Sequence, residues 1–172
     1  PKTNWTRTRY DLGGAGQVEG NSIQGVGHVL PQGGMAQYAI DFFGLDPRGH
    51  AVSVPVEKLG ESRVQDWTGW NADVLAVADG VVRDARNGIA DRKPLSPQEE
   101  PEELSARTLY GNFVVLEVAP GAYVHYAHLR QGSVTVRPGQ RVKRGAVLGH
   151  LGLTGAAGAP HLHFHVSDKA TF

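Results

Sequence analysis

The run from Pro160 to His165 reads Pro-His-Leu-His-Phe-His and places a histidine at every second position. In an extended strand alternate side chains share a face, so His161, His163 and His165 would line one face of a strand. Two imidazoles at positions i and i+2 converge on one small volume only when the backbone is extended. Neutral imidazole is also a good zinc ligand. The run therefore predicts a β-strand that carries a metal site.

Short β-branched runs bounded by Gly, Pro or Asn predict further strands elsewhere in the chain. The expected strands cover residues 74–82, 113–118, 122–129, 133–136 and 146–151. Asp79-Gly80 is a hairpin-turn signal, and the Arg-Pro-Gly-Gln segment at residues 137–140 predicts another tight reversal. The predicted fold is all-β, an antiparallel two-sheet β-sandwich with a metal site in a groove.

Residues 136–149 follow the cadence V-x-x-G-x-x-V-x-x-G-x-x-L-G, which is similar to barrel-sandwich hybrid folds, the biotinyl and lipoyl carrier domains included. A carrier lysine must sit on an exposed hairpin, whereas Lys169 lies beyond the last expected strand. A carrier function is therefore a distant third hypothesis, because likeness of fold does not transfer function.

The composition suits one domain over residues 1–172, because 172 residues with 23 Gly and 10 Pro allow a sizeable core and many turns. Residues 1–27 are Gly-rich and weakly patterned, and we expect them to wrap the sheet. Residues 87–107 carry three prolines and four glutamates, which predicts an exposed acidic loop. The chain begins at Pro1 without a signal peptide, as a processed soluble piece would.

The charges are balanced, with 17 basic and 17 acidic residues, and so give no reason to expect a nucleic acid or an anionic membrane as partner. No apolar run approaches the ~20 residues of a membrane-spanning helix. The chain has no Cys, so a zinc ion would have to bind to His and carboxylate side chains.

Three motifs occur in a characteristic order: Tyr126-Ala127-His128-Leu129, the segment 142–155 that ends Gly-Leu-Thr-Gly, and the Pro-His-Leu-His-Phe run at residues 160–164. Together they resemble the lysostaphin-type (LytM-like) zinc metalloendopeptidases, which cleave peptidoglycan cross-links. The resemblance extends from His28 to Val166. It implies a Zn²⁺ cofactor, peptidoglycan peptide as the substrate, and an extracytoplasmic location (secreted, periplasmic or cell-envelope); we expect a monomer.

The resemblance also implies roles for individual residues. His163 matches a zinc ligand, and Asp41, in the run Tyr-Ala-Ile-Asp-Phe at residues 38–42, matches the carboxylate ligand. His128 and His161 match two active-site histidines that do not bind the metal. His165 shares the face of His163 one pleat further along, where supporting the ligand is a commoner role than binding the metal.

The chain departs from the family pattern at the first ligand. The usual pattern places a His four residues before the Asp, but Gln37 stands there, and an amide is a poor zinc ligand. The nearest upstream histidine is His28, and the intervening Pro-Gln-Gly-Gly segment could return it to Asp41; this resembles a family variant with a longer His-to-Asp gap. His50 is the competing candidate.

The ligand set His28, Asp41 and His163 would leave the fourth tetrahedral position for water, whose pKa zinc lowers to about 7. His161 is then the expected general base, and His128 is expected to orient the water or the oxyanion, although the two could exchange roles. The predicted function is a zinc-dependent endopeptidase that hydrolyses peptide cross-links or stem peptides of peptidoglycan. The alternative is a catalytically silent wall-binding or regulatory domain of the same fold.

Three aromatic residues could stack on substrate, although anchoring the core or a loop is the commoner role; they are Trp67, Trp70 and Tyr110.

Overall fold

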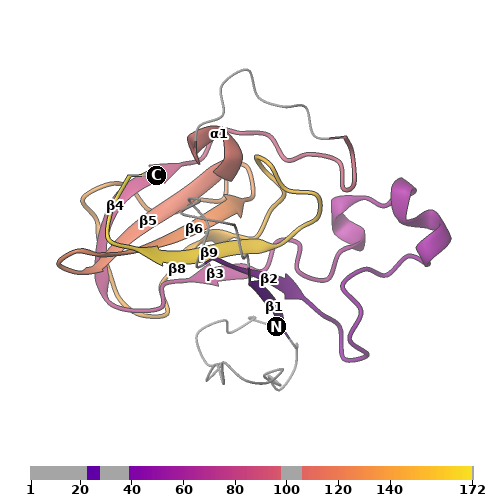
Figure 1. The fold of residues 1–172 in the computed structure, drawn as a ribbon, viewed down its shortest axis with the longest axis horizontal. Coiled ribbons are helices and arrows are strands. Elements are labelled where there is room, and N and C mark those ends of the chain that lie inside the picture. The colour runs from indigo at the N-terminus through magenta and orange to yellow at the C-terminus, as the bar shows by residue number, and fades with distance from the viewer. Residues whose placement is uncertain (1–22, 28–38, 98–105, 172) are drawn as a thin grey trace.

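The computed structural model describes residues 23–27, 39–97 and 106–171, which form nine strands in two antiparallel sheets (Figure 1). The large sheet has the spatial order β1 (Ile23–Gly27), β2 (Ile40–Gly44), β9 (Leu162–Ser167), β6 (Ala122–Leu129), β5 (Asn112–Ala119), β4 (Gly80–Arg86) and β7 (Arg141–Val142). The small sheet pairs β3 (Asp73–Leu75) with β8 (Val147–His150). The prediction of an all-β, antiparallel two-sheet fold is confirmed. Of the segment 1–27, only residues 23–27 lie within the described part.

The main hydrophobic core fills the space between the two sheets. Val74 of β3 and Leu148 of β8 are fully buried and pack in one cluster with Leu116 and Tyr126 of the large sheet. Successive side chains of a strand point to opposite faces, so residues one position away from these point outward from the core. A second, smaller cluster on that opposite face contains Tyr110, Phe113, Val115 and Ala127. This second face carries the histidines of β6 and β9.

Two of the expected strands differ from the observed ones. The run 74–82 is not one strand, because β3 ends at Leu75 and β4 begins at Gly80 in the other sheet. Asp79-Gly80 is therefore a link between sheets and not a hairpin turn. Asp79 accepts hydrogen bonds from the Arg144 backbone N–H at 2.9 Å and from Lys143 Nζ at 2.6 Å. These bonds tie the link between β3 and β4 to residues 143–144.

Residues 133–136 lie outside the observed strands, although Thr135 N–H donates to Leu148 O at 2.9 Å. The tight reversal expected at residues 137–140 is confirmed, since Gln140 N–H donates to Arg137 O at 3.1 Å. The run Ser-Val-Thr-Val has strand-like composition without becoming a strand. Part of its backbone bonds to a side chain in place of a neighbouring strand, since Val134 N–H donates to Asn87 Oδ1 at 3.0 Å.

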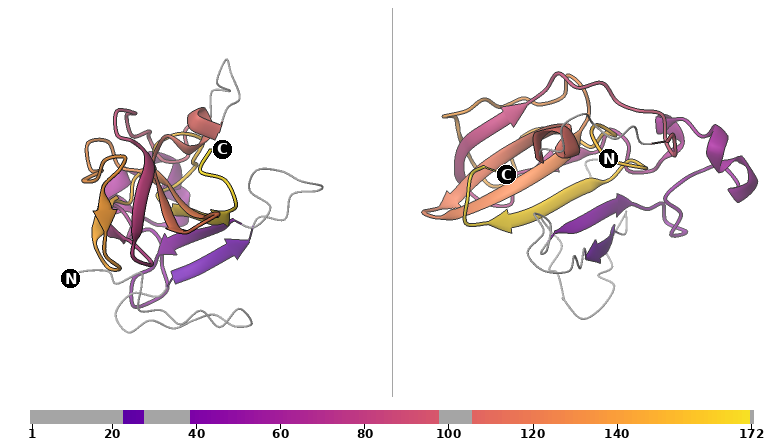
Figure 2. Two further views of the ribbon diagram at one scale, coloured as in Figure 1. Left: turned by 90° about the vertical axis from the view of Figure 1, so that its left-hand side faces the viewer. Right: turned by 45° about the horizontal axis from the view of Figure 1, so that its top comes forward.

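Two longer connections contain few or no strand residues. Residues 45–72 contain the short helices η1 (Val56–Glu61) and η2 (Val64–Asp66) and project beyond the ends of the strands (Figures 1 and 2). Residues 87–97 run alongside the segment 153–158, where Leu95 N–H donates to Gly158 O at 2.7 Å. The helix α1 (Ala106–Tyr110) leads into β5. In the described ranges no helix has the length and apolar character needed to cross a membrane.

We expect Gly111→Ala to destabilise the protein more than Gly132→Ala. Both glycines have left-handed backbones, with φ of 64° and 72°, so each substitution should cost about 1–2 kcal/mol of unfolding free energy. A Cβ at Gly111 would also lie 2.4 Å from the Thr154 carbonyl carbon, whereas nothing lies within 4 Å of one at Gly132. Urea denaturation of the two variants measures the difference. Equal losses would show that the close approach of residues 111 and 154 has no energetic importance.

Candidate active site

The pairing of β2 with β9 brings a carboxylate and two imidazoles together. Asp41 lies directly opposite His163 in the antiparallel register, so both side chains emerge on the same face. His163 Nδ1 is 3.1 Å from Asp41 Oδ1. His161 stands immediately before β9, and its Nε2 is 3.4 Å from the other oxygen, Asp41 Oδ2. All three residues are buried, so one buried carboxylate contacts two histidines.

His128 reaches this cluster through an irregularity in β6. Simple alternation would send His128 to the core side, because Ala127 already faces the second cluster. The register between β5 and β6 shifts at this point, and His128 adopts a left-handed φ of 61°. An extra residue of this kind redirects a side chain. The His128 ring centroid consequently lies 4.7 Å from that of His161.

Backbone carbonyl groups fix the orientation of both histidines that the sequence analysis placed outside the ligand set. His128 Nδ1–H donates to Thr154 O at 2.8 Å, and His161 Nδ1–H donates to Ala159 O at 2.8 Å. A carbonyl oxygen only accepts, so in each neutral ring Nδ1 carries the proton and Nε2 keeps the lone pair. Burial, followed by the charges of His161 and His163, lowers the pKa of His128 well below 6.5. His128 is therefore neutral at pH 7, with Nε2 as its acceptor.

Two more buried histidines stand behind His163. His165 Nδ1 is 3.2 Å from His163 Nε2, and the His165 ring stacks on His125 with centroids 4.3 Å apart. The far end of the row is held by backbone and hydroxyl groups, since His125 Nε2 lies 3.1 Å from Lys169 O and 2.9 Å from Ser167 Oγ. Burial lowers the pKa of His125 to about 4 and that of His165 to about 3. Both rings are therefore uncharged at neutral pH.

Two aromatic residues border the site; the sequence analysis named Tyr110 only as a possible stacking residue and did not name Phe43. The Tyr110 ring centroid is 4.9 Å from that of His163, and burial together with Asp41 raises the pKa of Tyr110 to about 12. Phe43 stacks on His161 with centroids 5.2 Å apart. Strand alternation could have found Phe43, which lies two positions after Asp41. No strand periodicity indicates that Tyr110 lies beside His163, because it ends the helix α1.

Asp41 and His163 fit two ligands of one zinc ion in chemistry and in spacing. Nitrogen and oxygen ligands of a tetrahedral zinc stand about 3.3–3.5 Å apart, close to the observed 3.1 Å between Asp41 Oδ1 and His163 Nδ1. His28 lies outside the described residues. The His50 side chain is 63% exposed and pairs with Asp46 at 3.6 Å. Within the described ranges no set of three His, Asp or Glu residues has the arrangement of a metal site.

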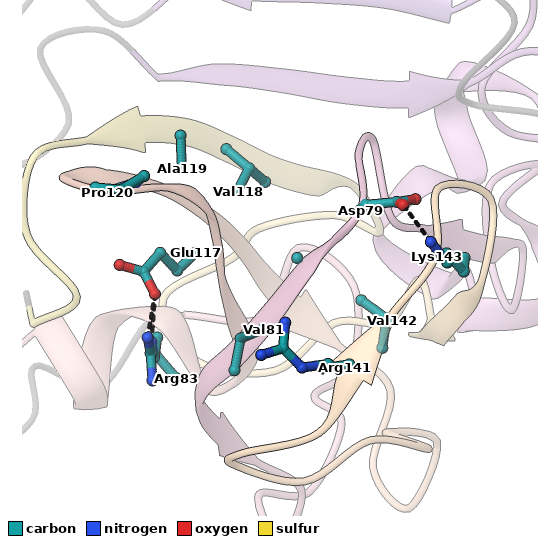
Figure 3. Close-up of a pocket in the computed structure, with 11 residues that line it drawn as sticks. Asp79, Val81, Arg83, Glu117, Val118, Ala119, Pro120, Arg141, Val142 and Lys143 are labelled. Atoms are coloured by element: carbon teal, nitrogen blue, oxygen red, sulfur yellow. Dashed lines mark hydrogen bonds and ion pairs between the residues drawn. The ribbon is translucent and has the colours of Figure 1, made fainter.

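A separate cavity of about 520 Å³ lies at the opposite edge of the large sheet, between β4, β5 and β7 (Figure 3). Two ion pairs border it, Arg83 with Glu117 and Lys143 with Asp79. Among the described residues, no histidine lines this cavity. It is therefore distinct from the histidine cluster on β2, β6 and β9.

We expect His125 to reduce the stability of the folded, chelator-treated protein as the pH falls. Its pKa is about 4 in the folded protein and about 6.5 in the unfolded chain, so between these values the unfolded state binds more protons. The unfolding free energy should fall by up to about 1.4 kcal/mol per pH unit below pH 6.5. His125→Phe removes this titrating group and keeps a flat ring against His165. Urea denaturation between pH 7 and pH 4 should give a shallower slope for the variant, and an unchanged slope would contradict the assignment.

Known proteins were compared with the chain at the level of sequence and of fold. The sequence profile of peptidase family M23 matches residues 66–171, more than half of the chain. A 67-residue stretch is 42% identical to the cell division protein DipM of Caulobacter vibrioides, and covers 36% of this chain but only 11% of that protein.

Among solved structures, the fold is similar to the catalytic domain of EnpA, a prophage-encoded M23 protein from Enterococcus faecalis, with a TM-score of 0.53. The identity is 13%, over 90% of this chain and 86% of that one. The catalytic domain of lysostaphin from Staphylococcus simulans aligns with a TM-score of 0.45 and 21% identity, over 83% of this chain and 80% of that one. The match of the family profile confirms the resemblance inferred from the motifs: the chain belongs to peptidase family M23.

Proposed function

We propose that the protein is a zinc-dependent endopeptidase that hydrolyses peptide cross-links or stem peptides of bacterial peptidoglycan. One observation carries the proposal: Asp41, His163, His161 and His128 meet on one buried face of the sheet. Two of these residues are spaced as ligands of a single metal, and the other two are imidazoles with one nitrogen bonded to a carbonyl. Membership of a peptidase family supports the class of reaction.

Asp41, His163 and His28 would hold the zinc ion. Bound zinc lowers the pKa of a water molecule to about 7 and polarises a carbonyl group. The His163 ring would use Nδ1, the nitrogen that faces Asp41, and its Nε2–H would then donate to His165 Nδ1. A hydrogen bond of this kind fixes the orientation of a ligating imidazole, so we assign His165 to positioning His163 and not to binding the metal.

His161 is the proposed general base. Its Nε2 faces Asp41 Oδ2, and in the neutral ring the Nδ1–H bond to Ala159 O leaves the lone pair on Nε2, which would accept a proton from water. His128 has the same tautomer, with Nε2 as an acceptor, and its lowered pKa keeps it neutral. An acceptor orients a water molecule but cannot donate to an oxyanion, so the geometry favours the water-orienting role for His128.

The substrate argument rests on the segment 155–159, which reads Gly-Ala-Ala-Gly-Ala and ends at the carbonyl that holds His161. Side chains this small leave room for an extended, slender peptide beside the catalytic residues. Wall stem peptides and short bridges have that shape. Peptidoglycan lies outside the cytoplasmic membrane, so the proposal places the protein there.

A catalytically silent wall-binding or regulatory domain is the second candidate. The observation that favours it is Gln37, which stands where the family pattern has its first histidine ligand. A domain that binds no zinc would have no activated water, whatever the state of His161 and His128. Metal content separates the two candidates directly.

We expect substitutions to separate zinc binding from turnover. His163→Ala, Asp41→Ala and His28→Ala should each lose zinc, because each removes a ligand. His161→Ala and His128→Ala should keep one zinc per chain and lose roughly 100-fold or more in turnover, since proton transfer contributes about 10²- to 10⁴-fold. Elemental analysis and steady-state kinetics on a peptide substrate give the two readouts.

The matched control for the first ligand is His50→Ala, which should retain full zinc and activity because His50 is exposed and pairs with Asp46. If His28→Ala retained zinc and His50→Ala lost it, His50 would be assigned as the first ligand in place of His28. Loss of metal in His161→Ala or His128→Ala would show that a ligand had been mistaken for a base.

The reaction itself predicts release of new amino groups from purified peptidoglycan, without new reducing sugar ends. A chelator should abolish the release and added zinc should restore it, because the metal activates the water. Reducing ends in place of amines, or release unaffected by chelation, would contradict peptidase action. No release from any of several wall types would favour the silent domain.

A further inference from the structure

The segment that carries Thr154 is held from outside by two residues of the 87–97 connection. Arg92 N–H donates to Leu153 O at 2.9 Å, and the Arg92 guanidinium donates from Nη2 to Pro97 O at 2.6 Å. The preceding residue, Asp91, accepts a hydrogen bond from Leu153 N–H at 2.8 Å. Asp91 and Arg92 together therefore hydrogen-bond both backbone groups of Leu153, its N–H and its C=O.

The Asp91 carboxylate also reaches a second segment. Its other oxygen accepts a hydrogen bond from Gln131 N–H at 2.9 Å. Gln131 follows the bulge that carries His128, and Leu153 directly precedes Thr154. The two amides that Asp91 joins thus belong to the two segments that make the hydrogen bond between His128 Nδ1 and Thr154 O.

Gly152 leaves the space that the Asp91 carboxylate occupies. A Cβ at Gly152 would come within 2.7 Å of Asp91 Oδ1 and within 2.3 Å of the Arg130 Cα. Only a residue without a side chain allows the carboxylate and residues 130–131 to approach so closely. Hydrogen bonds to an ionised carboxylate are stronger than those between neutral groups, which makes Asp91 an effective tie between the two segments.

We propose that Asp91 is a positioning residue for the proposed reaction: it holds the Thr154 carbonyl against His128 Nδ1 and thereby sets the tautomer and the angle of the His128 ring. His128 needs such support, because its left-handed backbone at φ 61° interrupts the regular strand. The Asp91 carboxylate accepts its hydrogen bonds from the backbone of Leu153 and Gln131, and neither residue belongs to β2 or β9, so Asp91 should act on His128 and leave zinc binding unchanged. The kinetic part of this inference rests on the proposed peptidase function.

The test compares Asp91→Ala and Asp91→Asn with Asp79→Ala. Asp79 is a matched control, because its carboxylate also joins two donors of a distant segment, Arg144 N–H and Lys143 Nζ, at the opposite edge of the large sheet. Asp91→Asn keeps the volume and one acceptor oxygen, so it remains informative if the alanine variant does not fold. Denaturation curves, zinc content, kcat, KM and the NMR tautomer signals of His128 are measured for each.

We expect Asp91→Ala to lower kcat roughly 10- to 100-fold, as for a catalytic group displaced by a fraction of an ångström to an ångström. KM and zinc content should stay within about twofold of the wild-type values. The kcat of Asp91→Asn should lie between that of the alanine variant and that of the wild type. In a His128→Ala background, the same Asp91→Ala change should alter kcat less than about twofold, because the group it positions is gone. An equal fall in that background, or an equal fall in Asp79→Ala, would overturn the assignment.

The NMR readout separates this inference from the proposed function. Loss of the Nδ1-protonated tautomer of His128 in the Asp91 variants, with retention in Asp79→Ala, supports the positioning role even if the wild-type protein hydrolyses nothing. An unchanged His128 signal in both Asp91 variants would overturn it even in an active enzyme.

Discussion

The antiparallel register between β2 and β9 is the constraint on which the site depends. It sets Asp41 opposite His163 and leaves Phe42 and Leu162 facing the core between the sheets. A slip of one residue would exchange the two faces, burying the carboxylate in the apolar core and sending Phe42 to the histidine side. The core and the site therefore specify the same register. Packing of the one side guarantees the geometry of the other.

Burial gives the histidine cluster its chemistry. In the described residues five histidines are buried on or beside one sheet face, and each has a hydrogen-bond or ion-pair partner; they are His125, His128, His161, His163 and His165. A buried polar group without a partner is costly, so the carbonyls of Thr154 and Ala159 are part of the fold's stability as well as of the site. The same low-dielectric surroundings keep His128 neutral, which suits a group that accepts a hydrogen bond from water.

The site is thus divided between a rigid sheet and docked segments. Asp41 and His163 stand on paired strands, whereas His128 and His161 take their orientation from carbonyls of the connection between β8 and β9. Residues 87–97, which the sequence suggested to be an exposed loop, supply Asp91 and Arg92 to that connection. Groups that must be placed within fractions of an ångström gain from such support around them.

The alternation of histidine with Leu162 and Phe164 was enough to predict a strand with imidazoles on one face, because the period of a strand is local and needs no knowledge of its partners. The glycine-bounded β-branched runs gave the all-β class for the same reason. Tertiary structure alone decided that residues 74–82 divide between two sheets, that a bulge turns His128 toward His161, and that Tyr110 and Asp91 join the site. These features arise from contacts between segments far apart in the chain, and such contacts produce no periodic residue pattern in the sequence of either segment.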